Sequence, residues 1–428
     1  MYVLRWYLWN FRKFVIMIID FSVENFRSIK EMQTLSMSAA SIVSKHKEID
    51  EQNLIKVSDK LSLLKSKAIY GANASGKSNI IKALMSFIAI VSDSVKNDRI
   101  LFFNIYPFSL STETDDKPCY FQLTFLLNNI HYRYGFEASK KEITSEWLFG
   151  TPGKKEVNFF TREGNNISVN EKQFKEGHKI IELYASSGET SISTNSLFLT
   201  VVKSFTGGVA KDIVDYISKI IVISVLSDNS LFSKAQELLS EENKKQIGDF
   251  LKISDIGIEH IGKLEYGSQD EKDVFVATAH KKFDSNLNEV RLVNFSMDFF
   301  ESDGTKKMFG ISHMILQALN EKIPIIIDEF DARLHPLLTK KIVELFNSDS
   351  NKGSQLIFAT HDTNLLDSKL LRRDQICFVE KDKYGASHFY TLVDFKGVRN
   401  DASFEKDYIA GRYGAIPFLG DFNSVIEG

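Results

Sequence analysis

Apolar and polar residues alternate along several short stretches of the chain, and this alternation is typical of half-buried β-strands. One such stretch covers residues 19–26, and two more cover residues 120–125 and 132–136. The pair Asn128-Asn129 lies between the last two, and asparagine tolerates the left-handed backbone that a tight turn requires. We therefore predict an antiparallel hairpin here.

Other stretches are continuously apolar. They cover residues 325–327, 356–358 and 376–379, and such short runs are typical of parallel strands that are buried on both faces. A helical pattern over residues 334–346 separates the first two runs. The C-terminal third is therefore predicted to be a strand-helix-strand series.

The middle of the chain has a different pattern. Helical spacing is seen over residues 210–221 and 231–251, and the region contains no fixed-period repeat, no long heptad run and no proline-rich linker. We predict a mainly helical insertion over residues 170–290, set within a single nucleotide-binding domain.

Composition and charge narrow the classes of protein that remain. The chain has 428 residues, of which 43% are hydrophobic and 25% charged, with 53 basic against 56 acidic side chains and a net charge of −3. These values fit a folded chain of two or three domain-sized units and exclude a disordered chain, a collagen-like chain and a polycation. The two cysteines, Cys119 and Cys377, form no disulfide framework or zinc motif, which favours a cytoplasmic location.

The N-terminal stretch is rich in apolar and aromatic residues, but Arg5, Arg12 and Lys13 interrupt it. It has no unbroken apolar run of about 18 residues that could span a membrane and no signal-type cleavage site. We expect residues 1–16 to be an extension that precedes Met17, with an interfacial anchor as the alternative. No membrane partner is expected.

The strongest motif is G-A-N-A-S-G-K-S at residues 71–78, which fits the phosphate-loop template G-x-x-x-x-G-K-[ST]. An apolar strand pattern over residues 63–70 precedes it and an amphipathic helix pattern follows it, as the motif requires. Backbone N–H groups of such a loop surround phosphates, Lys77 reaches the β- and γ-phosphates, and Ser78 binds Mg²⁺. The nucleotide-binding residues predicted here are Gly71, Asn73, Ser75, Gly76, Lys77, Ser78 and Asn79.

A second motif, Asp328-Glu329, follows the apolar run at residues 325–327. A carboxylate at the end of a buried strand can hold Mg²⁺, and an adjacent one can polarise the water that attacks the γ-phosphate. We therefore predict Asp328 as a metal ligand with Ser78, and Glu329 as the catalytic base, acting with Lys77.

Together with these motifs, residues 331–336 (D-A-R-L-H-P) and 359–362 (A-T-H-D) make the chain resemble the ATP-binding-cassette superfamily, in the branch that contains RecF, SMC proteins and the OLD nucleases. The resemblance implies an α/β fold: a P-loop NTPase like the SMC head, with a mixed sheet and an antiparallel N-terminal β subdomain. It implies that Asp331 contacts a partner subunit and that His361 is the switch histidine at the γ-phosphate. Asp328 and His361 would end successive parallel strands at one sheet edge.

Two further segments extend the resemblance. Residues 302–305 (S-D-G-T) are similar to the signature segment, which would bring Ser302 and Gly304 to the nucleotide of the opposite protomer. Residues 24–28 (E-N-F-R-S) are similar to the N-terminal motif of RecF and SMC heads and would place Arg27 and Ser28 near the nucleotide. The tail, residues 408–417, resembles that of bacterial abortive-infection ATPases of the RloA type. No glutamine-loop residue can be placed, because Gln122 lies within a predicted strand.

The resemblance divides the chain into an N-lobe over residues 17–169, the insertion, and a C-lobe over residues 291–428. The segment between Lys77 and Asp328 is far longer than a crossover of about 30 residues requires, which is the reason for expecting the insertion. After His361 the remaining sequence is too short for a Toprim nuclease, so we expect a separately encoded effector, a nuclease or toxin.

The preferred hypothesis is an ATPase that binds ATP and Mg²⁺ between two protomers and acts as a sensor or regulatory subunit in bacterial phage defence. The alternatives are an ATP-gated scaffold with little turnover and a RecF-like DNA-repair ATPase. DNA binding stays open, because the lysine pairs are scattered along the sequence and do not form one cluster.

Overall fold

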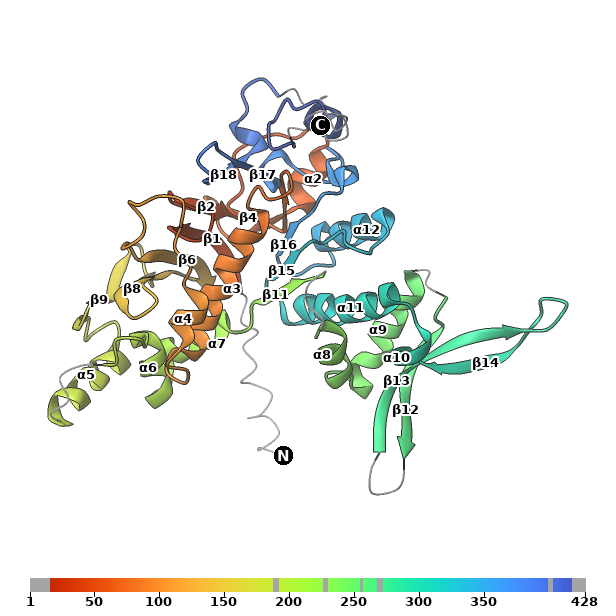
Figure 1. Ribbon diagram of the computed structural model, residues 1–428, viewed down its shortest axis with the longest axis horizontal. Helices are drawn as coiled ribbons and strands as arrows, with labels where there is room; N and C mark the ends of the chain where they lie inside the picture. The colour runs from red at the N-terminus through yellow and green to blue at the C-terminus, as the bar shows by residue number, and fades with distance from the viewer. Residues whose placement is uncertain are drawn as a thin grey trace, which may run out of the picture.

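The computed structural model describes residues 16–187, 192–225, 230–254, 257–267, 272–398 and 403–417. The expected N-terminal extension therefore lies outside the described residues, except for Ile16. Two large sheets organise the body of the molecule, and a third, smaller sheet projects from it (Figure 1).

The first large sheet is antiparallel and has seven strands in the order β10-β9-β8-β7-β6-β1-β2. The predicted hairpin is confirmed, since β6 and β7 pair with Leu127 opposite Ile130. Asn128 and Asn129 have φ angles of 54° and 63°, the left-handed values that the two-residue turn needs. The strands are β1 (Ile16–Glu24), β2 (Gln33–Ser36), β6 (Cys119–Leu127), β7 (Ile130–Ala138), β8 (Ile143–Thr151), β9 (Val157–Glu163) and β10 (Asn166–Val169).

The second large sheet has six strands in the order β11-β15-β16-β5-β17-β18, and all neighbours are parallel except β17 and β18. The three continuously apolar runs are its buried strands, as predicted. The predicted strand over residues 63–70 is instead two strands, one in this sheet and one in a small hairpin with β3. The bounds are β3 (Leu54–Lys56), β4 (Ser62–Leu64), β5 (Ser66–Tyr70), β11 (Ile221–Ser224), β15 (Ile325–Asp328), β16 (Leu356–Ala359), β17 (Ile376–Lys381) and β18 (Ser387–Thr391).

Helix α3 (Lys77–Asp93) links the two large sheets (Figure 1). Its Phe87 ring stacks on Phe136 of β7 at 5.6 Å and meets the edge of Phe21 of β1 at 5.8 Å. The start of α3 follows the end of β5 through the 71–76 loop. Burial of one helix face on the antiparallel sheet therefore fixes the direction in which the phosphate-loop motif points.

The middle of the chain differs from the prediction in two of its helices and in the strands that it contains. The helix predicted to reach residue 221 ends at Ile217, because the β-branched run that follows forms β11 beside β15. The helix predicted over residues 231–251 is two helices, since Ser240 caps the second with a capping box to Asn243. The range 170–290 thus holds helices, a strand of the core sheet, and strands of the projecting sheet, while its limits as an insertion stay a prediction.

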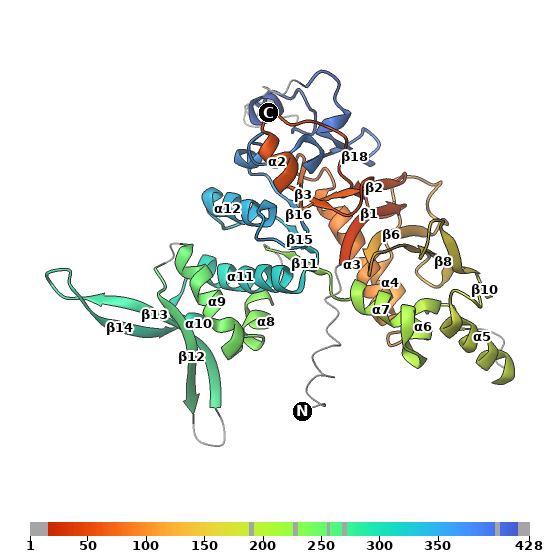
Figure 2. The same cartoon turned by 180° about the vertical axis from the view of Figure 1, so that it is seen from behind.

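The projecting sheet is a three-stranded antiparallel arm of β12 (His260–Gly267), β13 (Lys272–Phe283) and β14 (Glu289–Ser296), which stands away from the body in both views (Figures 1 and 2). The remaining helices are α2 (Lys47–Gln52), α4 (Ile100–Asn104), α5 (Lys175–Ser187), α6 (Phe198–Phe205), α7 (Gly208–Ile217), α8 (Leu231–Glu237), α9 (Glu241–Ile253), α10 (Met297–Phe300), α11 (Asp303–Glu321), α12 (Pro336–Asn347) and α13 (Phe404–Ile409), with 3₁₀ turns at Thr363–Leu365, Arg373–Gln375 and Leu392–Asp394. Across the described ranges, we find no helix with the length and apolar character needed to cross a membrane.

Candidate nucleotide-binding site

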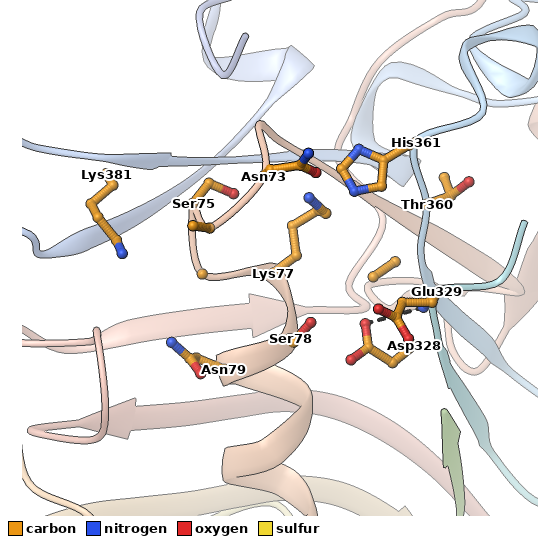
Figure 3. A pocket seen from close by; sticks show the side chains of 13 residues that line it. Asn73, Ser75, Lys77, Ser78, Asn79, Asp328, Glu329, Thr360, His361 and Lys381 are labelled. Atoms are coloured by element: carbon orange, nitrogen blue, oxygen red, sulfur yellow. Dashed lines mark hydrogen bonds between the residues drawn. The ribbon is translucent and has the colours of Figure 1, made fainter. Parts of the chain in front are cut away.

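Three neighbouring parallel strands, β15, β16 and β5, end at the same edge of the core sheet. In open α/β sheets ligands bind at this carboxyl edge. A cavity of about 310 Å³ lies here, and Figure 3 shows Lys77 and Ser78 on one side of it facing His361, Glu329 and Asp328 on the other. It is lined by residues 73–79, Asp328, Glu329, residues 359–361 and Lys381.

The 71–76 loop needs glycine at two positions. Gly76 has φ +114°, and a Cβ there would lie 2.1 Å from Ser387 Oγ and 2.9 Å from Ser28 Oγ. A Cβ on Gly71 would lie 2.5 Å from the carbonyl oxygen of Val379. The two glycines therefore allow the loop to lie directly against β17 and β18 while its backbone turns inward.

A network of hydrogen bonds between hydroxyl and amide groups holds the loop on the side that faces away from the cavity. Ser28 Oγ accepts a hydrogen bond from Asn79 Nδ2 at 2.6 Å and shares another with Ser387 Oγ at 2.7 Å. Ser387 Oγ also lies 2.6 Å from the backbone oxygen of Ser75, to which it can donate. Ser28 thus reaches the site through the loop rather than by lining the cavity.

Lys77 is only 8% exposed, and its Nζ donates to the carbonyl oxygens of Gly71 at 2.8 Å and Ala72 at 3.1 Å. Loss of hydration lowers the pKa of this ammonium to about 8, although Asp328, Asp331 and Glu329 oppose the shift. At neutral pH the group is a partly dehydrated cation beside the loop, which favours a polyanionic ligand.

Asp328 and Glu329 end β15 at the opposite wall. Asp328 is buried, and its Oδ1 accepts a hydrogen bond from the backbone N–H of Glu329 at 3.1 Å. Glu329 has φ 55°, a left-handed value that strains a residue with a side chain, and its Oε2 accepts a hydrogen bond from Ser224 Oγ at 3.2 Å. The strained backbone turns the two adjacent carboxylates so that both line the cavity.

His361 and Asp331 meet at the end of β16. Asp331 Oδ1 accepts hydrogen bonds from Thr360 Oγ1 at 2.7 Å and from the backbone N–H of His361 at 3.1 Å. Loss of hydration, and then the nearby Lys77 ammonium, lower the pKa of His361, so the imidazole is neutral at physiological pH. Asp331 therefore orients the segment that carries His361 and is not itself part of the cavity lining.

The oxygen donors present fit Mg²⁺. The Ser78 hydroxyl and the Asp328 carboxylate lie across from each other in Figure 3, and hard oxygen ligands of this kind suit magnesium. Within the described ranges no group of three or more His, Cys, Asp or Glu side chains is placed to hold a metal. An ion held by Ser78 and Asp328 would thus take its other ligands from water and phosphate oxygens, as magnesium at nucleotide sites does.

Other predicted site residues lie elsewhere. Arg27 lines a neighbouring cavity of about 400 Å³ that also borders Ser78, Asp328 and Glu329. Ser302 and Gly304 lie at the start of α11 and line a separate cavity of about 650 Å³. Their contacts with a nucleotide stay predictions.

Three residues at or next to the cavity were missed. Lys381 ends β17, Ser387 begins β18 and Ser224 ends β11. The apolar run of residues 221–223 before Ser224 could have revealed a core strand, since it resembles the apolar runs from which the other core strands were predicted. Nothing in the sequence pairs Ser387 with the distant loop.

No curated protein is significantly similar to this chain. Many solved chains match in structure, among them the SMC head domain from Thermotoga maritima, with 12% identity, a TM-score of 0.43, and coverage of 87% of this chain and 98% of that chain. Another is the Smc head domain bound to the C-terminal domain of ScpA from Pyrococcus furiosus, with 14% identity, a TM-score of 0.41, and coverage of 93% and 99%.

In sequence, residues 68–367, more than half of the chain, match a family whose description is "AAA domain, putative AbiEii toxin, Type IV TA system". The matched range includes the phosphate-loop motif, Asp328-Glu329 and His361. The chain therefore belongs to this family of AAA-domain proteins.

Proposed function

We propose that this chain binds ATP with Mg²⁺ at the edge of the core sheet and hydrolyses it. The observation that carries the proposal is the convergence of three strand ends on one cavity: β5 supplies the phosphate loop, β15 the adjacent carboxylates, and β16 the histidine. Membership of an AAA-domain family supports the same activity.

In this mechanism the loop N–H groups and the Lys77 ammonium bind the β- and γ-phosphates. Lys77 exchanges its hydrogen bonds to the Gly71 and Ala72 carbonyls for phosphate oxygens. Glu329 orients a water molecule for in-line attack on the γ-phosphorus and accepts its proton. The neutral His361 imidazole is placed to hydrogen-bond a γ-phosphate oxygen, and Mg²⁺ at Ser78 and Asp328 would offset charge on the phosphates.

We further propose that two protomers enclose two nucleotides, with Ser302, Gly304 and Asp331 of each protomer acting on the partner's site. Two observations support this arrangement. Ser302 and Gly304 do not line the nucleotide cavity of their own chain, and they open instead onto an exposed cavity beside Arg333 and His335.

The biological role that we propose is a regulatory or sensor ATPase in a bacterial anti-phage, abortive-infection system of the RloA-like kind, acting with a separately encoded effector. The family description, which mentions a toxin–antitoxin system, supports a function that depends on a second component. The competing role is an ATP-gated scaffold in which binding without turnover is sufficient.

Binding and turnover of ATP by three variants test the activity. Lys77→Ala is expected to lose both, whereas Glu329→Gln should bind ATP and lose turnover by about 10²–10⁴-fold, the range for a lost general base. Lys179→Ala removes an exposed lysine of α5 and should behave like the unmodified chain. Normal hydrolysis by Lys77→Ala would refute the site, and full biological function of Glu329→Gln would favour the scaffold.

A further inference from the structure

Three cations and three exposed aromatic rings alternate along one strip of the surface. We define this cation-aromatic strip by Arg99, Phe102, Phe103, Lys140, Tyr106 and Arg27. The guanidinium of Arg99 lies 4.9 Å from the centre of the Phe103 ring and 5.6 Å from that of Phe102. Lys140 Nζ lies 5.8 Å from the Phe102 ring and 5.6 Å from the Tyr106 ring.

Arg27 completes the strip, with its guanidinium 4.4 Å from the centre of the Tyr106 ring. Phe102 is 52% exposed, Phe103 51% and Tyr106 36%, which is unusual for three large rings so close together. Most of them lie on or next to α4, a short helix that packs beside α3 in both views (Figures 1 and 2). The strip is therefore an accessible face of the N-terminal half.

The cations of the strip are not paired with any carboxylate of the described residues. Within the ranges that the structure describes, no ion pair joins Arg27, Arg99 or Lys140 to a carboxylate. The Nε atom of Arg27 is buried and has no hydrogen-bond partner.

We propose that the cation-aromatic strip binds single-stranded nucleic acid. Aromatic rings on which bases stack, interleaved with cations that meet the phosphates, are the chemistry by which proteins hold single strands without reading their sequence. A duplex hides the faces of its bases, so it cannot use the rings. A second copy of this chain would bring its own strip of positive charge and would leave the cations without an acidic partner.

The strip leads toward the nucleotide site. Arg27, Phe103 and Tyr106 line the cavity of about 400 Å³ that Ser78, Asp328 and Glu329 also line. Phosphates would be repelled by those two carboxylates, so a bound strand would end at Arg27. Its terminus would then lie next to the residues that act on the γ-phosphate.

Fluorescence anisotropy with labelled 20-nucleotide oligo(dT), oligo(U) and a 20-base-pair duplex tests the proposal in nucleotide-free, full-length protein. We expect both single strands to bind more tightly than the duplex. Phe102→Ala and Phe103→Ala should each weaken binding about tenfold. Arg99→Ala should weaken binding and reduce the slope of log K against log salt by about 0.7.

Tyr384→Ala is the matched control, because Tyr384 is also exposed and also carries a cation, Lys383, 4.9 Å from its ring centre. Its affinity for single strands should equal that of the unmodified chain. Lys77→Ala removes the phosphate-loop lysine without altering the strip, so this variant should bind oligonucleotides normally. The test of the strip therefore does not depend on whether the protein hydrolyses ATP. Tighter binding of the duplex, unchanged binding by the phenylalanine variants, or no binding at 50 mM salt would overturn the proposal.

Discussion

The nucleotide cavity and the cavity at the start of α11 differ in how far the chain itself holds their residues in place. In the nucleotide cavity, the buried Lys77 makes two hydrogen bonds to carbonyl groups, and Ser387 packs against Gly76. In the α11 cavity, the side chain of Arg333 is 48% exposed and forms an ion pair with an Asp303 side chain that is 77% exposed. An exposed pair of this kind contributes about 0–1 kcal/mol.

The apolar groups show the same contrast. Leu337 and Ile253, which line the α11 cavity, are 69% and 84% exposed, whereas the strands behind the nucleotide cavity are buried. A phosphate-binding loop acts through groups that are already oriented, so it must be fixed before the ligand arrives. Exposed apolar side chains that lie together on a surface are a common feature of interaction sites. The comparison teaches that the chain itself fixes the residues of the nucleotide cavity, whereas few contacts fix those of the α11 cavity.

The largest expected effect comes from mixing two inactive variants. Lys77→Ala destroys the loop but leaves the α11 cavity intact, and Ser302→Arg does the reverse. If the sites are shared between protomers, half of the mixed dimers are heterodimers and each contains one intact site. ATP hydrolysis should therefore rise from near zero to about a quarter of that of the unmodified protein.

The control for that experiment is each variant mixed with itself, and size-exclusion chromatography with ATP checks that the proteins associate. Persistent inactivity of the associated mixture would show that Ser302 acts within its own chain, and the contrast between the two cavities would then lose its functional meaning.

Substituting Gly76 tests the fixed cavity directly. Gly76→Ala forces a Cβ to within 2.1 Å of Ser387 Oγ at a φ of +114°. We expect ATP affinity to fall about a hundredfold and the free energy of unfolding to fall by about 1–3 kcal/mol, the cost of a strained backbone site. Equilibrium binding and urea denaturation measure the two effects.

A control variant and a double variant accompany the Gly76 experiment. Gly153→Ala adds a Cβ that has no atom within 4 Å and should change neither property. Gly76→Ala combined with Ser387→Gly removes the closest collision but keeps the 2.9 Å contact with Ser28 Oγ and the unfavourable φ angle, so affinity should recover in part. Equal loss in the single and double variants would mean that close packing against β18 is irrelevant.

The contrast between the two cavities also separates what the sequence predicts from what it does not. The loop, its flanking strand and helix, and Asp328-Glu329 are predicted because each is local: glycines, a lysine and apolar runs lie within a few residues of one another. Ser387 is not predicted, because it supports Ser75 across 312 residues of chain, a separation that only the packing of β18 reveals.

Errors in the middle of the chain have a similar cause. Ile220 to Ile223 continue the apolar spacing of α7, so local pattern alone extends the helix. Pairing with β15 turns these residues into a strand instead, and their β-branched side chains suit that environment. On β14 of the projecting arm, residues 289–292 alternate polar and apolar side chains, so this strand could have been predicted from the sequence and was missed.

The pH dependence of nucleotide affinity gives an effect of intermediate size. Burial lowers the pKa of Lys77 to about 8 in the free protein, whereas contact with phosphates favours the protonated form. Affinity should be constant below about pH 8 and fall about tenfold per pH unit above it, because the proton must then be taken up on binding. Isothermal titration from pH 6.5 to 9.5 measures this profile, and Lys77→Arg should flatten it. A nucleotide affinity that rose with pH would contradict the view that the protonated Lys77 ammonium binds the phosphates.

The smallest expected effect concerns the support behind the loop. Ser387→Ala removes hydrogen bonds to Ser28 and to the backbone of Ser75 but leaves every cavity-lining side chain in place. Each bond contributes about 0.5–1.5 kcal/mol to folding, and because the ligand-free loop loses the same support, only part of this loss changes ATP affinity, which should fall less than about tenfold. Turnover at saturating ATP should stay nearly constant, since Glu329 is untouched. Ser44→Ala, which removes a hydroxyl bonded to Asp50 far from the site, is the matched control for loss of a serine hydrogen bond. A fall in turnover without a fall in affinity would contradict this expectation. It would mean that Ser387 contributes to the hydrolysis step and not only to the conformation of the loop.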